Sequence, residues 1–158
     1  MGFQVHVETF KEYSYSGPFD FKELIDYLKA WYERNGYDIN EKEYSEKNND
    51  LKTHKIKWEC EKEIDDYHSY IMKFVLELKN FKEIEKDNKK IVNGDLKLTL
   101  EFADVKRDIE EKWEGPVSKR FARAVYDKFI MEDKESEINK QLKKEVESLF
   151  KEIKQYFG

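Results

Sequence analysis

Cysteine, histidine and glycine are scarce in this chain of 158 residues, and each shortage excludes a class of chemistry. A single cysteine rules out an internal disulfide bond, and with only three histidines it leaves few ligands for a zinc site. The six glycines are dispersed, so there is neither a phosphate-cradling loop nor a dinucleotide fingerprint. Gly-x-Ser-x-Gly and His-Glu-x-x-His are also absent. We therefore predict no catalytic residues, no metal site and no cofactor.

Long apolar runs are missing too. No stretch of about 18 apolar residues occurs, which argues against a membrane-spanning helix. Residues 1–6 are not followed by the apolar region of a signal peptide, so we expect a cytoplasmic protein. The net charge of −5 argues against nucleic acid as a partner, because nucleic-acid domains carry a basic excess or a basic stripe.

The residues that remain suffice for one thin core. Charged residues make up 41% of the chain, but 15% are aromatic and bury a large area per side chain. The length fits a single domain over residues 1–158.

The first third of the chain predicts a strand, a helix and an edge strand. Residues 3–15 alternate between apolar and polar side chains, as in a half-buried strand that stops at Gly17-Pro18. A capping box formed by Asp20 and Glu23 starts a helix, and Asn35-Gly36 ends it. Residues 37–46 are charged, which suits an edge strand.

The middle of the chain is patterned with a period of two. If Trp58 and Phe74 both point inward, a loop over residues 65–67 pairs Ile64 with His68 and His54 with Leu78. The inward face of the first of these strands then holds His54, Ile56, Trp58, Cys60 and Ile64, and that of the second holds Tyr70, Met72, Phe74, Leu76 and Leu78.

The next segment contains two turn signals. Residues 82–92 read as a small excursion that turns at Asp87-Asn88, and Asn93-Gly94 predicts a type I′ hairpin. Leu96, Leu98, Leu100 and Phe102 then form one face of a strand. Residues 104–113 fit either a helix or a strand continued through a bulge; we favour the strand.

The C-terminal part predicts helices. Gly115-Pro116 precedes an apolar stripe over residues 117–129, and a second stripe runs from Ile138 to Tyr156. Residues 132–137 interrupt the stripes, so 116–157 forms either one kinked helix or two. Together the elements predict an α+β fold in the order β-α-β-β-β-β-α-α, with a mostly antiparallel sheet of five to six strands and helices on one face.

Two groups of side chains are candidates for binding. The aromatic residues Trp58, Tyr70, Phe74 and Trp113 would line an apolar ligand pocket, although such residues more often form a core. Arg107, Lys119, Arg120 and Arg123 form a basic cluster that would bind an anion or a partner protein, although a solvated helix face explains them as well.

The histidines and the cysteine read as structural. His54 and His68 lie at opposite ends of one hairpin, about 33 Å apart at 3.3 Å per residue, so they cannot share a site. His6 points to the polar side of its own strand. Cys60 lies on the apolar face beside Trp58, where a thiol behaves as a small hydrophobe.

The element order, with Trp113-Glu114-Gly115-Pro116 leading into Phe121 and then residues 125–130, resembles a group of small uncharacterised archaeal α+β proteins common in reduced-genome lineages. This resemblance implies a cytosolic archaeal protein and supplies no activity or functional residues. At the level of fold, the layout is similar to helix-grip proteins of the START and Bet v 1 type, in which a curved sheet wraps a long C-terminal helix around an apolar cavity. This chain has one helix instead of two after the first strand, and its C-terminal helix is divided.

Our leading hypothesis is a non-catalytic domain that binds an apolar small molecule or a partner protein. The first alternative is a homodimer assembled through residues 138–157, with Leu142, Val146, Leu149 and Ile153 packed between chains. The second is an enzyme that uses carboxylates in a helix-grip cavity, which requires inward acids and a cavity of a few hundred Å³.

Overall fold

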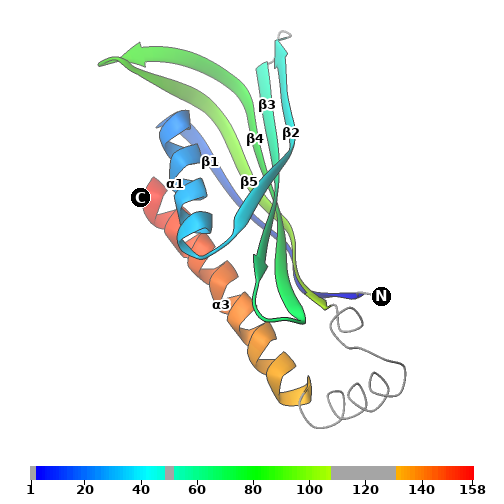
Figure 1. The fold of residues 1–158 in the computed structure, drawn as a ribbon. Coiled ribbons are helices and arrows are strands. Elements are labelled where there is room, and N and C mark those ends of the chain that lie inside the picture. The colour runs from blue at the N-terminus through cyan, green and yellow to red at the C-terminus, as the bar shows by residue number, and fades with distance from the viewer. Residues whose placement is uncertain (1–2, 49–51, 108–130) are drawn as a thin grey trace.

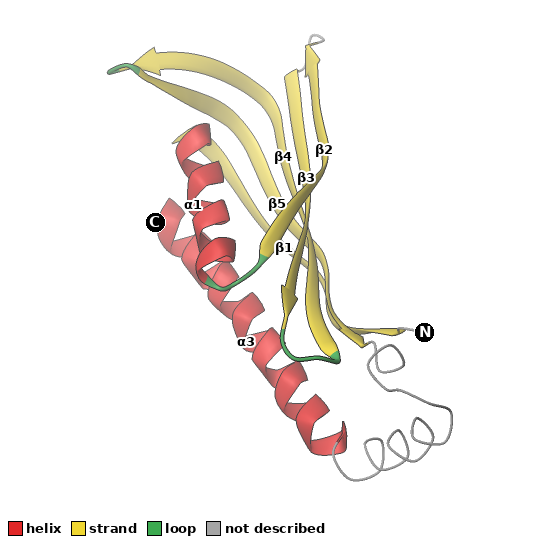
Figure 2. Cartoon of the chain, in the orientation of Figure 1, coloured by secondary structure: helices red, strands yellow, loops and turns green. Residues whose placement is uncertain are grey.

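The computed structural model describes residues 3–48, 52–107 and 131–158, which form one antiparallel sheet and two helices (Figure 1). The elements are β1 (Phe3–Asp20), α1 (Phe21–Arg34), β2 (Asp38–Asn48), β3 (Lys52–Glu63), β4 (His68–Lys86), β5 (Lys89–Arg107) and α3 (Met131–Phe157). The sheet has five strands in the order β1-β5-β4-β3-β2, and both helices lie against the same face (Figure 2). The predicted α+β class, the antiparallel sheet, the order of the described elements along the chain and the one-sided helix layer are confirmed.

Several predictions fall outside the described residues. These are the helix over 117–129, the structure of 108–113 and the part of 116–157 that precedes residue 131. Within the described part, α3 runs without a break from Met131 to Phe157, so the interruption predicted at 132–137 does not end a helix. Within the described helices, none is both long and apolar enough to cross a membrane.

The predicted boundaries of α1 are confirmed. The Asp20 carboxylate accepts a hydrogen bond from the Glu23 backbone N–H at 3.1 Å, and Gly36 takes a φ of +87° just after the helix. The strand before it runs farther than predicted, through Gly17-Pro18 to Asp20. Pro18 is tolerated because β1 is at the edge of the sheet, where its missing N–H can face away from β5.

The predicted register of β3 and β4 is confirmed. Trp58 lies opposite Phe74 and His54 opposite Leu78, and the Ile64 N–H donates to the His68 carbonyl at 2.9 Å. Ile64 itself is 37% exposed and does not join the inward face, because it lies beyond the last paired residue of β3. The charged β2 is an edge strand, as predicted.

The predicted hairpin at Asn93-Gly94 is wrong. Both residues lie inside β5, and the chain turns at Asp87 and Asn88, whose φ angles of 54° and 63° suit a type I′ turn. Gly94 is needed for a different reason, since a Cβ built there would lie 2.6 Å from the Phe81 Cβ. The register of β4 and β5 shifts at this point, between Lys79 and Lys82, and the bulge brings Phe81 over Gly94.

A second bulge reverses the inward parity of β5. The register with β4 shifts between Lys73 and Phe74, and Glu101 is the extra residue on β5. Phe102, predicted to be inward, therefore leaves the core, and Ala103 and Val105 replace it. Residues 104–107 continue as strand, as favoured.

The core lies between this sheet face and the two helices. Leu142, Val146, Leu149 and Ile153 of α3 are fully buried, as are Leu24 and Leu28 of α1. At about 1.5–3 kcal/mol for each fully buried aliphatic side chain, the stripe of α3 is a large part of the driving force for docking that helix.

We predict that Gly94→Ala destabilises the protein by about 1–3 kcal/mol, because the new methyl group collides with Phe81 in a closely packed bulge. Asn93→Ala is the matched control, since this exposed side chain lies in a strand and its loss should change the free energy of unfolding by less than about 0.5 kcal/mol. Urea denaturation measures both. Equal losses would indicate that the Asn-Gly pair forms a turn after all.

Candidate functional site

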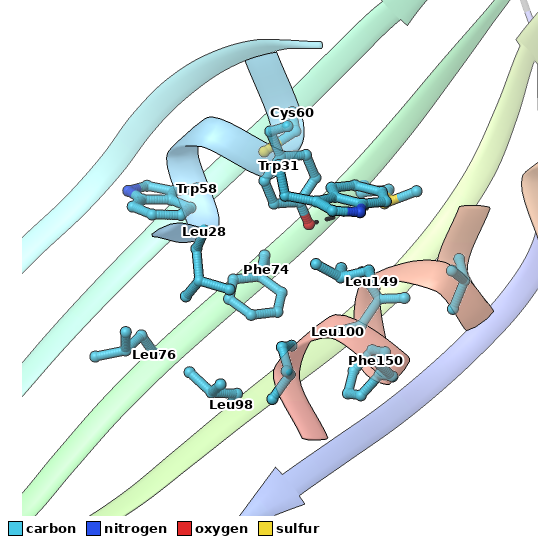
Figure 3. Close-up of a cluster of buried hydrophobic side chains, with 14 of the residues drawn as sticks. Leu28, Trp31, Trp58, Cys60, Phe74, Leu76, Leu98, Leu100, Leu149 and Phe150 are labelled. Atoms are coloured by element: carbon cyan, nitrogen blue, oxygen red, sulfur yellow. Dashed lines mark hydrogen bonds between the residues drawn. The ribbon is translucent and has the colours of Figure 1, made fainter. Parts of the chain in front are cut away.

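The predicted pocket residues lie in the middle of the core. The rings of Trp58 and Phe74 stack with centroids 6.2 Å apart, in the same buried cluster as Leu28 of α1 and Leu149 of α3 (Figure 3). Tyr70 is on the same sheet face and is 1% exposed. Trp113 lies outside the described residues. The structure therefore brings three of the four aromatic residues onto one wall, and a ligand pocket among them stays a prediction.

A buried polar cluster lies at one end of this wall. Glu145 of α3 is 5% exposed, and its Oε1 accepts hydrogen bonds from the Lys62 ammonium and from the Tyr37 hydroxyl, the latter at 3.3 Å. The other oxygen, Oε2, is buried and has no hydrogen-bond partner in the described part of the chain. The Lys62 ammonium also lies 4.8 Å from the centroid of the Tyr37 ring, a cation–π distance.

Tyr70 links the cluster to the start of the packed part of α3. Its hydroxyl donates to the Ile138 carbonyl at 2.6 Å, and its ring centroid is 5.5 Å from the Lys62 ammonium. Burial raises the pKa of the Tyr37 and Tyr70 hydroxyls, and the negative charge of Glu145 raises both further. Both phenols therefore stay protonated at neutral pH and act as hydrogen-bond donors.

Sequence reasoning missed Lys62 and Glu145, although both carry a signal. Lys62 has the same parity as Trp58 and Cys60, so it points inward with them. Glu145 follows Leu142 by three residues and therefore lies on the buried face of α3. Two opposite charges on facing apolar stripes indicate an ion pair between them.

Each histidine pairs with a carboxylate instead of another histidine or the thiol. His6 Nδ1 is 2.7 Å from Asp104 Oδ1, and His54 Nε2 is 2.9 Å from Glu46 Oε1. Asp104 was not singled out from the sequence; its side chain is fully buried and also accepts a hydrogen bond from Gln4. Within residues 3–48, 52–107 and 131–158, no group of histidine, cysteine and acidic side chains could hold a metal ion.

His68 is held by the loop that precedes it. Its Nδ1 is 2.8 Å from Asp65 Oδ1, and that carboxylate also accepts hydrogen bonds from the Tyr67 and His68 backbone N–H groups. Burial opposes ionisation of Asp65, but these hydrogen bonds outweigh it and lower the pKa of Asp65. Asp65 thus acts as a turn residue, as its position in a three-residue loop indicates.

The predicted basic cluster is mostly beyond the described residues. Arg107 is the last residue of β5 and is half-buried. Lys119, Arg120 and Arg123 lie outside, so anion or partner binding by these four residues stays a prediction.

A groove lies between the edge strand β1 and α3. It encloses about 460 Å³ and is lined by Lys11, Glu12, Glu147, Phe150, Lys151, Lys154, Gln155 and Gly158. The residues from α3 recur at intervals of three and four, so they form one helix face beside the buried stripe. Lys11 points across the groove, with its ammonium 5.6 Å from the centroid of the Phe150 ring.

Three lysines and two glutamates, Glu12 and Glu147, line the groove, which gives it an excess of one positive charge. Lys11, Lys151 and Lys154 form no ion pair with a carboxylate among the described residues, whereas Glu12 is 3.4 Å from the Lys97 ammonium. Three ammonium groups without a carboxylate partner, beside a Phe150 ring that is 4% exposed, can hold an anionic group together with an apolar part.

The helix stripe of the homodimer hypothesis is already covered. Leu142, Val146, Leu149 and Ile153 are fully buried against the sheet of their own chain. A homodimer through residues 138–157 stays a prediction, and it would have to use the exposed face of α3.

Comparison of the chain with protein-family models and with curated protein sequences finds no match. The functional argument therefore rests on the chain's own geometry.

We predict that Lys62→Met destabilises the protein by about 1–3 kcal/mol, because it leaves the buried Glu145 carboxylate without its charged partner. Adding Glu145→Leu should restore most of the loss, since a buried pair can be replaced by apolar side chains at little cost. Lys57→Met on the same strand removes a partly exposed ion pair, with Glu43 at 3.5 Å, and should cost less than about 0.5 kcal/mol. A double variant less stable than Lys62→Met would contradict this assignment.

The Cys60 thiol should resist alkylation in the folded protein. Burial raises its pKa to about 12 from an ordinary value of 9.0, so the reactive thiolate is almost absent at pH 8. The thiol keeps its proton longer in the folded than in the unfolded state, so this contribution to stability is present below pH 9 and lost as the pH rises. Iodoacetamide labelling followed by mass spectrometry, in buffer and in urea, tests this. Comparable rates in the two conditions would show that the thiol is accessible.

Proposed function

We propose that this chain is a non-catalytic domain that binds small anionic molecules with an apolar body in the groove between β1 and α3. The observation that carries the proposal is the combination of a concave site, three unpaired lysines and the Phe150 ring. A volume of about 460 Å³ is within the range of small-ligand sites. The groove extends along α3 from Glu147 to Gln155, about 12 Å at 1.5 Å per residue, and reaches Gly158 beyond the helix, which suits an elongated ligand.

The proposal includes the helix-grip likeness, an archaeal origin and a cytoplasmic location. The first is supported by a long C-terminal helix that lies across one face of an antiparallel sheet (Figure 1). The other two rest on the sequence resemblance. Fold likeness alone does not identify a ligand, so the ligand class is argued from the groove.

An enzyme that uses buried carboxylates is the second candidate function. Glu145 favours it, because it is an inward acid with one unpaired oxygen beside Lys62 and Tyr37. A structural ion pair explains the same contacts, and the effect of replacing both partners separates the two accounts: a purely structural pair can be exchanged for apolar residues.

The proposed function predicts that dodecanoate, used below its micelle-forming concentration, binds the protein and that Lys151→Glu with Lys154→Glu weakens binding about tenfold. The substitutions replace two ammonium groups, which attract the carboxylate of the ligand, with two carboxylates, which repel it. A tenfold loss of affinity corresponds to about 1.4 kcal/mol. Isothermal titration calorimetry measures the dissociation constant.

Two controls make this test specific. Dodecyltrimethylammonium has the same chain and the opposite charge, and it should bind the original protein more weakly than dodecanoate. Lys140→Glu with Lys143→Glu makes the same change in net charge on exposed positions of α3 outside the groove and should leave the affinity within about twofold. Dodecanoate binding that the groove variant does not weaken would place the ligand elsewhere and refute the proposal.

A further inference from the structure

The solvent-exposed face of α3 is basic. From Lys140 to Gln155 its exposed positions hold five lysines, one glutamate and three neutral side chains: Lys140, Gln141, Lys143, Lys144, Glu147, Ser148, Lys151, Lys154 and Gln155. The other two acids of this segment are occupied, since Glu145 is buried beside Lys62 and Glu152 accepts a hydrogen bond from the Tyr27 hydroxyl. The exposed face therefore carries an excess of four positive charges in a chain whose total charge is −5.

The five lysines form a single row along α3, which we call the lysine stripe. Lys140, Lys144 and Lys151 are separated by four and seven residues, which correspond to one and two turns of a helix. Lys143 and Lys154 lie three turns apart on the adjoining row. The lysine stripe is about 21 Å long at 1.5 Å per residue, and it lies opposite the buried aliphatic face of the helix. None of these lysines forms an ion pair with a described carboxylate.

The other helix shows that solvation does not require such a bias. The exposed charged side chains of α1 are three basic and three acidic ones: Lys22, Lys29, Arg34, Glu23, Asp26 and Glu33. Mixed charges would solvate α3 equally well. In addition, like charges one turn apart, such as Lys140 and Lys144, repel each other and weaken a helix. A bias that lowers the stability of α3 and that solvation does not need indicates a surface that meets an anion.

We propose that the lysine stripe docks this domain on membranes that contain anionic phospholipid. A bilayer presents a flat plane of headgroup charge, and a straight row on one helix face lets all five ammonium groups reach that plane together. Each lysine near such a surface strengthens binding roughly fivefold. The groove between β1 and α3 opens on the same face, since Lys151 and Lys154 also line it. Docking therefore holds the groove against a source of anionic molecules with an apolar body.

The negative total charge of the chain does not prevent this contact. A helix is about 10–12 Å across, so the charges on the outer face of the sheet lie at least that far from a surface that touches the exposed side of α3. The Debye length is about 10 Å at 0.1 M salt, and those charges are therefore largely screened.

Nucleic acids fit the lysine stripe less well than a membrane does. The backbones of a duplex wind around its axis, so a straight row of lysines follows a row of phosphates for only part of its length. The stripe contains no arginine, the side chain that most often grips a phosphate or a base edge with two hydrogen bonds. The exposed positions of α3 from residue 140 to 155 include no aromatic side chain on which the bases of a single strand could stack.

Co-sedimentation with vesicles tests the proposal. At about 0.1 M salt the original chain should bind vesicles that contain about one third phosphatidylserine in phosphatidylcholine, and it should be released at about 1 M salt, where the Debye length is about 3 Å. Lys140→Glu, Lys143→Glu and Lys144→Glu together should weaken binding at least tenfold. The matched control is Lys86→Glu, Lys89→Glu and Lys90→Glu, which makes the same change in net charge on exposed positions at the β4–β5 turn and should weaken binding no more than about threefold.

The outcomes separate this inference from the proposed function, beyond which it goes. The three substituted lysines of α3 do not line the groove, so dodecanoate binding, measured by calorimetry without vesicles, should persist in that variant. Vesicle binding without dodecanoate binding would refute the proposed function and leave the docking surface standing. Circular dichroism checks that each variant is folded. Equal losses in the two variants, equal binding to vesicles of phosphatidylcholine alone, or tighter binding to a DNA or RNA duplex than to the anionic vesicles would overturn the docking surface.

Discussion

Every other feature of this chain depends on the burial of one face of the sheet beneath α1 and α3. The aliphatic stripe of α3 and the inward side chains of β3, β4 and β5 are buried in one cluster, which includes Trp58 and Phe74 (Figure 3). This burial fixes which side each strand residue faces, because a slip of one residue would turn every apolar side chain outward. Polar side chains on the buried faces must therefore pair between the sheet and the helices, as Glu145 does, and the other polar side chains lie on the outer surface.

The bulges are what give the surface its shape. Each bulge adds a residue to one strand, so the side chains that follow it point to the opposite face of the sheet, and the local twist increases. One brings Phe81 of β4 over Gly94 of β5. Another removes Phe102 from the core and places Asp104 on the opposite face, where His6 and Gln4 satisfy its carboxylate. A buried acid is stable there only because those two partners are in place.

The parts of the fold that could be predicted are those governed by local chemistry and strict alternation. The capping box of α1 and the register of β3 with β4 follow from side-chain type and from a loop whose length fixes parity. The prediction of a turn at Asn93-Gly94 was wrong because glycine is used both in left-handed turns and where two segments pack closely. Only the position of Phe81 shows that Gly94 serves the second purpose. Of the candidate site, three aromatic residues were placed on the correct face. The Lys62–Glu145 pair and the β1–α3 groove were missed because each joins segments far apart in the chain.

The central claim is that ligands meet this domain at the outside of a packed sheet–helix layer. The most direct measurement is a ¹⁵N–¹H correlation spectrum of the assigned protein as dodecanoate is added. The account predicts that shifts concentrate at Lys11, Glu12 and residues 147–158, with the amides of Trp58 and Phe74 unchanged. Large shifts at Trp58 and Phe74 with little change along α3 would show that the ligand enters the interior, and would contradict it.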